Sequence, residues 1–219
     1  MEFFEVVTTR RTVREFEEKP IDLVCIQKII ECGLKAPSND HLRRWEFIVI
    51  DDIEMRKKLV GKEGDNIIQR NEEETRAIID NWGLIDGKQR NMFLYAIPRQ
   101  AKMILTAGAV IIPCFYQRST PLLKPINLSS LNAFASIWLC IENILLAAVT
   151  EGIFGVTRIP KSPGSIKKLL NIPEEYEIPC ILALGYPKKG SKVLPQHEIN
   201  SEERIRFNRW NNKASKKMK

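Results

Sequence analysis

Three stretches of the chain are apolar over almost their whole length, and they constrain the fold more than any other feature. Residues 107–116 and 178–184 have the length of buried strands, whereas residues 129–150 are long enough to indicate a helix. That helix approaches the length of a membrane span. Glu142 and Asn143 lie near its centre, where polar groups are costly in lipid. We therefore expect a helix buried in a core or a dimer interface, and no membrane association.

Shorter segments with helical or strand spacing surround these stretches. The pattern predicts strands at 47–50 and 152–159, and helices at 2–9, from Asp22 to the Ala36-Pro37 stop, at 53–60, at 162–170 and at 202–210. Pro113 interrupts the first apolar strand and indicates an edge position or a bulge. No G-x-G-x-x-G or P-loop pattern follows a strand, so we predict an α+β sandwich rather than a nucleotide-binding βαβ fold.

Residues 61–99 differ in kind from the rest of the chain. They are charged, they include Trp82, Asp86-Gly87 and Tyr95, and they show only broken helical periodicity. We expect a single domain over residues 1–219, with a cap or lid insert at about 61–99 and a basic tail at about 211–219.

The net charge of +7 belongs to the C-terminal end, because seven Lys and Arg residues and no acidic residue follow Glu203. The body is therefore neutral, and we expect no specific nucleic-acid partner; a basic tail is a solvated end or a non-specific contact. Five scattered cysteines without a C-x-x-C pair indicate reduced core cysteines. No basic start leads into an apolar run, so we expect a cytoplasmic protein. His41 and His197 form no metal-binding pattern.

Arginines crowd the start of the chain at Arg10, Arg11 and Arg14, with Thr12 between them. On an extended run Arg10, Thr12 and Arg14 share one side, and on a helix end Arg10 and Arg14 share a face. Two converging guanidinium groups and a hydroxyl are suited to a phosphate or another anion. The alternative is a solvated basic patch paired with the glutamates at positions 15, 17 and 18.

A second polar string follows the helix that ends at Ala36 and precedes the 47–50 strand. It contains Pro37, Ser38, Asn39 and His41. Such a small, amide-rich loop suits contact between a planar ring and backbone, and an ordinary helix-to-strand turn is the alternative. The serines show no nucleophile-elbow pattern, so an enzyme built on this chain would rely on a cofactor for its chemistry.

Taken in order, these strings resemble the nitroreductase family of FMN-dependent oxidoreductases. The matching strings are Arg-Arg-Thr-Val-Arg-Glu-Phe at 10–16, Ala-Pro-Ser at 36–38, Trp-Glu-Phe-Ile-Val-Ile at 45–50, Glu-Gly-Ile-Phe-Gly at 151–155 and Leu-Ala-Leu-Gly-Tyr-Pro at 182–187. The resemblance covers nearly the whole chain. It implies a three-layer sandwich, with a central, mostly antiparallel sheet flanked by helices, and a C-terminal segment exchanged in a homodimer.

The resemblance also implies a site for FMN. The FMN phosphate would be held by Arg10, the backbone of Arg11, Thr12, and Lys189 or Lys192. Arg14 would reach the pyrimidine edge of the flavin and stabilise the negative charge of its reduced form. The ring and ribityl chain would pack against Pro37, Ser38, Asn39 and His41 of the other subunit. Backbone near the reactive nitrogen of the ring would come from Gly155, Val156, Thr157 and Arg158.

The activity that the resemblance implies is a two-electron transfer in a ping-pong scheme. NADH or NADPH would reduce the flavin, and a small-molecule acceptor such as a nitroaromatic, a quinone or a free flavin would take the electrons, without an essential catalytic side chain. The chain departs from the usual family pattern at His41, Arg43, Arg44 and Phe154. The alternative is an FMN-binding protein of the same fold without NAD(P)H turnover, in a flavin-cleaving, storage or dehalogenating role.

Overall fold

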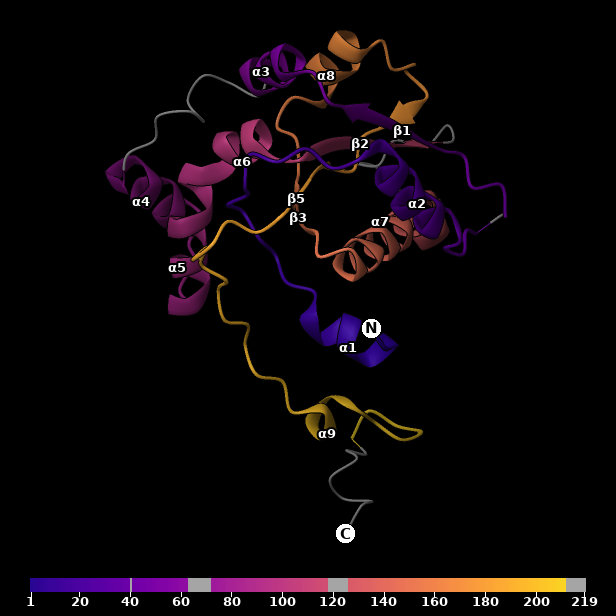
Figure 1. Cartoon of the computed structure of the whole chain (residues 1–219). Helices are drawn as coiled ribbons and strands as arrows, with labels where there is room; N and C mark the ends of the chain where they lie inside the picture. Colours follow the sequence, from indigo (N-terminus) through magenta and orange to yellow (C-terminus); the bar gives the residue numbers. More distant parts are fainter. Residues whose placement is uncertain (40, 63–71, 118–125, 212–219) are drawn as a thin grey trace.

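A computed structural model describes residues 1–39, 41–62, 72–117 and 126–211. Its centre is a sheet in the order β1-β2-β5-β3, with β4 also paired to β2 (Figure 1). All of these pairings are antiparallel. The strands are β1 (Trp45–Ile50), β2 (Ala109–Tyr116), β3 (Phe154–Arg158), β4 (Tyr176–Glu177) and β5 (Ile181–Gly185).

Helices cover both faces of this sheet, as Figure 1 shows. One hydrophobic cluster joins the sheet to α3 (Ile53–Lys62), α6 (Gln100–Thr106) and α8 (Pro163–Leu170), and a second joins it to α2 (Leu23–Leu34) and α7 (Asn132–Thr150). Residues of β2 alternate between the two clusters, because neighbouring side chains of a strand point to opposite faces. This three-layer α+β sandwich confirms the predicted fold class.

The long apolar stretch forms α7, preceded by the short helix η3 (Leu128–Leu131). By length and composition alone, residues 128–150 could cross a membrane, since an 18-residue window within them has a mean hydropathy of 1.8. In the structure α7 packs on the sheet and on α2, and Ile137, Cys140, Ile141 and Ile144 are fully buried. The core therefore accounts for the inner face of α7, whereas only 39% of its most apolar window is buried and Leu139 on the outer face is 50% exposed.

Close packing of α2 on α7 depends on one glycine. A Cβ atom at Gly33 would lie 2.5 Å from Ile144 Cγ1 and 3.1 Å from Cys140 Sγ, both shorter than normal contacts. The start of α2 is fixed by Asp22, whose carboxylate accepts a 2.8 Å hydrogen bond from the Val24 amide, as expected for an N-cap.

Of the segment predicted as an insert, the structure describes residues 61–62 and 72–99. The latter form α4 (Glu72–Asn81), α5 (Gly87–Ala96) and the short helix η2 (Ile97–Arg99), at one side of the sheet (Figure 1). The helix η2 continues directly into α6, which the sequence analysis missed, as it missed the two-residue strand β4. The broken periodicity of this segment thus reflects two short helices separated by a turn.

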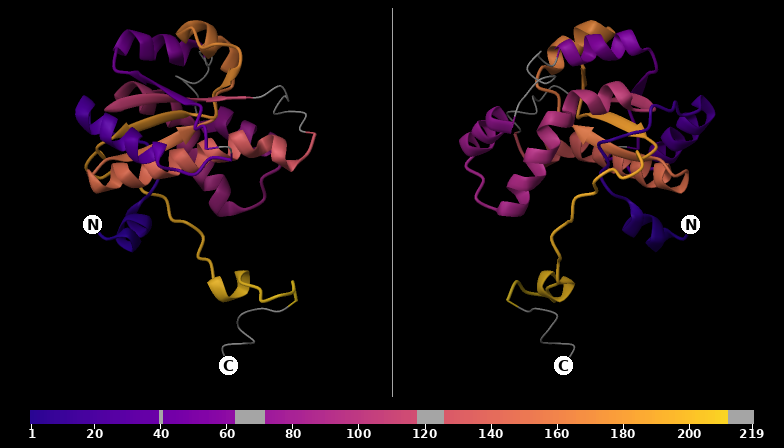
Figure 2. Two further views of the ribbon diagram at one scale, coloured as in Figure 1. Left: turned by 90° about the vertical axis from the view of Figure 1, so that its right-hand side faces the viewer. Right: turned by 60° about the vertical axis from the view of Figure 1, so that its left-hand side comes forward.

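Both ends of the described chain project from the body (Figure 2). They are α1 (Phe3–Thr9) and an arm, residues 186–211, which contains α9 (Ser201–Arg204). The helix predicted at 202–210 is wrong beyond Arg204, because Ile205 is extended and Asn208 adopts a left-handed backbone with φ of 63°. Large apolar side chains on both ends are exposed, among them Phe4 and Trp210 at 82% each.

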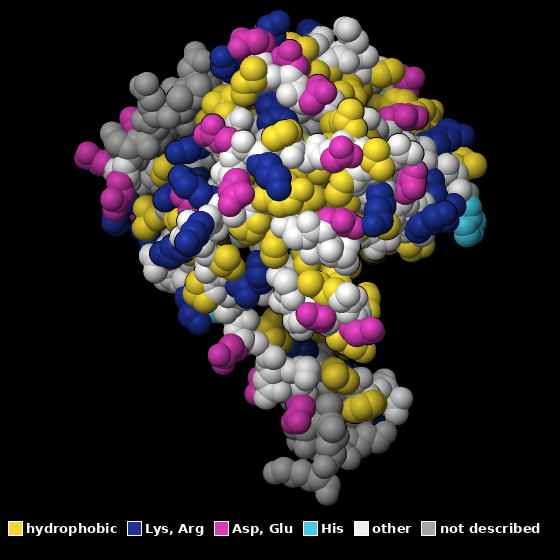
Figure 3. Space-filling model, in the orientation of Figure 1, with side chains coloured by type: hydrophobic (Ala, Val, Ile, Leu, Met, Phe, Trp, Pro, Cys, Tyr) yellow, Lys and Arg dark blue, Asp and Glu magenta, His cyan; other side chains and the backbone are white. Residues whose placement is uncertain are grey.

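Charged side chains of opposite sign alternate over the face of the body drawn in Figure 3. Of the cysteines, Cys114, Cys140 and Cys180 are buried, which confirms the prediction of core thiols for these three. The prediction is wrong for Cys32, which is exposed because it lies on the outer face of α2.

Candidate functional site

The arginine-rich segment, residues 10–17, lies between the edge of the sheet and the arm. The Val13 amide donates to the Gly155 carbonyl of β3 at 3.3 Å, and Thr12 forms a parallel bridge with Gly155. The Lys188 amide donates to the Glu15 carbonyl at 3.0 Å. Three separate strings of the sequence analysis are therefore brought together here: the arginines, the start of the Gly155–Arg158 string, and the start of the arm.

Side chains of the three arginines point to different partners. Arg10 Nε pairs with Glu142 Oε1 of α7 at 3.0 Å, and Arg11 Nη2 donates to the Leu194 carbonyl of the arm at 2.5 Å. The alternative of a patch neutralised by nearby glutamates is not what the structure shows for Arg10, whose partner lies 132 positions away in the sequence. The partners fix Arg10 and Arg11 on either side of the segment.

Among the described residues, Arg14 is held neither by a carboxylate, as Arg10 is, nor by a backbone carbonyl, as Arg11 is. It is half-buried against α5, and its hydrogen-bond contact is a 3.9 Å approach of Nη2 to Met92 Sδ. Within the described residues, no carboxylate forms an ion pair with it. Burial lowers the pKa of Arg14, and nearby Tyr95 partly opposes this shift. A guanidinium remains charged in proteins even so, so this site holds a partly desolvated positive charge that an anionic group would stabilise.

The string Gly155, Val156, Thr157 and Arg158 forms most of β3, the last strand of the sheet order. Arg158 is buried, and its Nε lies 3.4 Å from Gln100 Oε1 of α6, so its side chain is part of the body. A Cβ atom at Gly155 would lie 2.6 Å from Leu184 Cδ2 and 2.9 Å from Leu145 Cδ2. The glycine therefore allows β3 to pack closely on β5 and α7.

The second polar string lies at the start of α7. The Asn39 amide donates to Ser136 Oγ at 3.3 Å, and Asn132 Nδ2 donates to Asn39 Oδ1 at 2.9 Å. Ser38 Oγ is buried, has no hydrogen-bond partner among the residues that the structure describes, and borders a cavity of about 350 Å³. Pro37 and His41 are exposed, and His41 has a left-handed φ of 58°.

The two strings do not form one pocket within a single chain. Arg10 contacts α7 at Glu142, whereas Asn39 contacts it at Asn132. Ten helical residues separate these contacts, which is about 15 Å along the helix axis. The two candidate lysines are exposed on the arm: Lys189 precedes a turn at Gly190, and Lys192 Nζ lies 5.7 Å from the centre of the Tyr95 ring.

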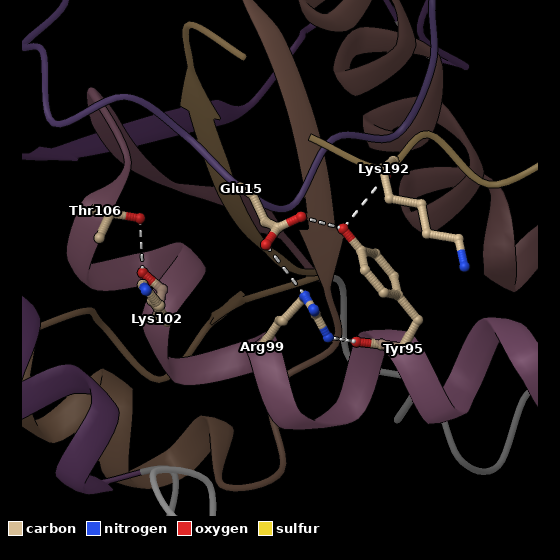
Figure 4. Close-up of polar contacts among 6 residues, drawn as sticks. All are labelled: Glu15, Tyr95, Arg99, Lys102, Thr106 and Lys192. Atoms are coloured by element: carbon tan, nitrogen blue, oxygen red, sulfur yellow. Dashed lines mark hydrogen bonds and ion pairs between the residues drawn. The ribbon is translucent and has the colours of Figure 1, made fainter. Parts of the chain in front are cut away.

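A polar cluster beside Arg14 was not predicted. Glu15, Tyr95 and Arg99 meet there, from the arginine-rich segment, α5 and η2 (Figure 4). Glu15 and Tyr95 lie 80 positions apart, so no local spacing records their contact. A sequence feature that could have indicated this cluster is Tyr95, an isolated tyrosine within the charged insert.

Comparison with known proteins agrees with the family resemblance found in the sequence. A model of the nitroreductase family matches residues 7–186. An iodotyrosine deiodinase of Daphnia pulex is 30% identical over 212 residues, which cover 90% of this chain and 65% of that protein. The chain thus spans about two thirds of that relative's length. A provisionally named NADH dehydrogenase/NAD(P)H nitroreductase of Archaeoglobus fulgidus is 26% identical over 215 residues, 95% of this chain and 99% of the relative.

The crystal structure of an oxidised iodotyrosine deiodinase, bound to FMN and 3-iodo-L-tyrosine, superimposes with a TM-score of 0.71. It is 19% identical, and the match covers 95% of this chain and all of the other. At 19% identity the superposition shows the fold alone. Membership of the family rests on the family model, which matches most of the chain. The chain belongs to the nitroreductase family.

Proposed function

We propose that this protein is a homodimeric, FMN-dependent oxidoreductase that takes electrons from NADH or NADPH and passes them to a small-molecule acceptor, such as a nitroaromatic, a quinone or a flavin. The observation that carries the proposal is Arg14, a half-buried guanidinium with no acidic partner among the described residues. Such a charge is stabilised when a bound anionic or electron-rich group supplies what the protein lacks. Bound FMN would supply the two-electron chemistry, as flavins do in other enzymes.

Each part of the FMN molecule has candidate partners in the described chain. Arg10, Arg11 and Thr12 lie in one short segment and offer guanidinium, backbone and hydroxyl donors to the phosphate, with Lys189 or Lys192 of the arm as a further cation. Arg14 would face the pyrimidine edge. Backbone of the β3 string, Gly155, Val156, Thr157 and Arg158, would lie against the ring.

A second copy of the chain would complete this site. The separation of about 15 Å along α7 keeps Asn39 away from Arg10 within one chain. Pro37, Ser38, Asn39 and His41 of a second copy would close over the ring, and the unpartnered Ser38 hydroxyl would gain a partner there. Exposed apolar side chains on α1 and the arm, such as Phe4 and Trp210, provide surface that dimer formation would bury.

The first test is an absorbance spectrum of the purified protein, followed by anaerobic addition of NADH and of NADPH. We expect a yellow protein whose flavin band is bleached by at least one of the two. A colourless protein that fails to bind added FMN contradicts the proposal. A yellow protein that neither nucleotide bleaches supports the alternative of an FMN-binding protein without NAD(P)H turnover.

Arg14→Ala tests whether the Arg14 guanidinium acts on bound FMN. The variant, loaded with FMN, should be reduced more slowly than the wild type, because the cation that stabilises reduced flavin is gone. Arg76→Ala is a matched control, since Arg76 is exposed on α4 and pairs with Glu72 on the same helix. Equal reduction rates in flavin-loaded Arg14→Ala and wild type would show that Arg14 does not act on the flavin.

Mixed dimers test whether the site is shared between subunits. Arg14→Ala and Ser38→Trp each damage every site of their own homodimer. In a mixed dimer one site carries both changes and the other carries neither, so mixing the two impaired proteins should give more activity than either homodimer alone. Failure to gain activity, when mixed dimers are shown to form, means that both strings serve the same subunit's site.

Reductive dehalogenation is the second candidate reaction. It is favoured by the most identical relative described above, which is named iodotyrosine deiodinase. Here two electrons and a proton replace the carbon–iodine bond by carbon–hydrogen and release iodide. Anaerobic incubation of chemically reduced protein with 3-iodotyrosine should release iodide and re-oxidise the flavin if this reaction occurs; unchanged reduced flavin excludes it.

A further inference from the structure

We propose that Tyr95 and Arg99 are positioning residues that hold the carboxylate of Glu15 away from Arg14, so that the Arg14 charge stays available to the flavin. This inference rests on the proposed function, because it concerns how the FMN site is tuned. It assigns a role to α5 and η2 of the insert.

The Glu15 carboxylate is held by two side chains from the insert (Figure 4). The Tyr95 hydroxyl donates to Glu15 Oε2 at 2.5 Å, and Arg99 Nε lies 3.4 Å from Glu15 Oε1. The two holding side chains also support one another, since the Arg99 guanidinium lies 3.9 Å from the centre of the Tyr95 ring and donates to the Tyr95 carbonyl at 3.0 Å. Both carboxylate oxygens of Glu15 therefore have partners.

The arm fixes the same cluster from the other side. The Tyr95 hydroxyl oxygen lies 3.3 Å from the Lys192 carbonyl, and the Lys188 amide bonds to the Glu15 carbonyl. Figure 4 shows the hydroxyl between the Glu15 carboxylate and the Lys192 backbone, with the Lys192 side chain running beside the Tyr95 ring. The position of Glu15 is thus set by three elements that are distant in the sequence.

Arg14 is the immediate neighbour of Glu15, yet it makes no ion pair with it. A free glutamate beside a half-buried, unpaired guanidinium would be attracted to it, because opposite charges in a partly desolvated site interact more strongly than in water. Tyr95 and Arg99 instead hold this carboxylate in contacts of their own. We infer that an uncompensated Arg14 is the feature being preserved.

The ionisation states required by this arrangement follow from the same contacts. The Tyr95 hydroxyl is the main group that lowers the pKa of Glu15, with further lowering by Arg99 and the Lys192 backbone, so Glu15 is a carboxylate at neutral pH. Burial and the bond to Glu15 raise the pKa of Tyr95, so Tyr95 keeps its proton and remains a donor. The carboxylate is therefore charged and able to neutralise Arg14 if it is released.

A cation beside the flavin favours the reduced, negatively charged form, and a carboxylate that pairs with the cation removes that effect. Releasing Glu15 should therefore lower the reduction potential of bound FMN. The measurement is the midpoint potential of bound FMN in the holoprotein, for the wild type and for Tyr95→Phe, Glu15→Gln, the double variant, and the control Tyr176→Phe on β4.

We expect Tyr95→Phe to weaken binding of reduced FMN, relative to oxidised FMN, about tenfold, which lowers the two-electron potential by about 30 mV. Glu15→Gln should not lower the potential, and the double variant should match Glu15→Gln, because the released group no longer carries a charge. Tyr176→Phe should match the wild type. Arg99→Gln, which removes the other contact to Glu15, should lower the potential as Tyr95→Phe does.

Three results overturn the inference while FMN binding is intact: an unchanged potential in both Tyr95→Phe and Arg99→Gln, a double variant that keeps the full loss, or an equal loss in Tyr176→Phe. The second result would mean that Tyr95 acts only through the shape of the insert. A wild-type protein that binds no FMN instead contradicts the proposed function itself, so the two failures are distinguishable.

Discussion

Gly185, the last residue of β5, links the core to the candidate site through one contact. A Cβ atom there would lie 2.7 Å from Cδ1, 2.8 Å from Cγ and 3.0 Å from Cβ of Phe16. Phe16 is buried, with 3% of its surface exposed, and it directly follows Glu15 in the arginine-rich segment. The ring is rigid and enclosed, so Gly185→Ala must displace either β5 or the segment that carries Arg10, Thr12 and Arg14.

The size of the effect follows from two opposing contributions. Overpacking a buried site costs about 1–3 kcal/mol, and replacing glycine by alanine restricts the unfolded chain, which stabilises by about 0.4–1 kcal/mol. We expect a net loss of about 1.5 kcal/mol, which lowers the Tm by about 3–6 °C for a chain of this size. FMN should also bind more weakly, because the displaced segment carries the proposed phosphate and flavin contacts.

Urea unfolding of the protein without and with FMN measures both effects. Gly164→Ala is the control: it lies in the first turn of α8, a Cβ atom there has no neighbour within 4 Å, and the change should stabilise by about 0.5–1 kcal/mol. In a Phe16→Ala background, which lacks Cγ and Cδ1, Gly185→Ala should cost less stability than it does in the wild type. Equal stability of Gly185→Ala and Gly164→Ala would refute the steric argument, and normal FMN affinity in a destabilised Gly185→Ala would refute the link to the site.

Three further predictions concern a cap, a carboxylate and the thiols. Asp22→Ala should lower the unfolding free energy by about 1 kcal/mol in urea titrations through loss of the α2 N-cap, and Asp22→Asn, which retains an acceptor, should lose less. The folded pKa of Glu15 lies below its unfolded value, so the ionised carboxylate stabilises the protein fully above the unfolded pKa of about 4.3, and this stabilisation is lost as the pH falls through the folded pKa. Glu15→Gln should therefore flatten the curve of unfolding free energy against pH below about pH 4.3. An unchanged curve counts against the contact of Glu15 with Tyr95. A thiol reagent should label Cys32 in the native protein and leave the buried thiols of Cys114, Cys140 and Cys180 unlabelled. Burial raises the pKa of each of these three thiols to about 12. Rapid labelling of the three would contradict the packing.

The layers of the fold could be predicted because each has a local record in the sequence. The β2 strand is covered by helices on both faces, so its residues are apolar without alternation, and the sequence shows a continuous apolar run. Pro113 fits this strand because residues 112–114 pair with β1, while the described pairings to β5 and β4 involve residues on either side of them. The edge character that Pro113 indicated is therefore local.

Contacts between segments that are distant in the sequence could not be predicted, because they leave no local pattern. The arginine cluster was evident, but its side-chain directions depend on Glu142 in α7 and on the Leu194 carbonyl in the arm. The cluster around Glu15 depends on Tyr95 and Arg99, which entered the sequence analysis only as parts of an irregular charged insert. Propensity and spacing describe neighbours within about one turn of a helix or a few residues of a strand, and these partners lie much further apart.

The helix α7 contacts both polar strings and keeps them apart within one chain. Its inner face is committed to the core, while Glu142 near its middle holds Arg10 and Asn132 at its start holds Asn39. A rigid helix fixes the separation of these two strings, and folding within one subunit leaves it unchanged. If FMN contacts both strings and a second copy of the chain supplies one of them, as we propose, flavin affinity and dimer formation are linked through the geometry of one helix.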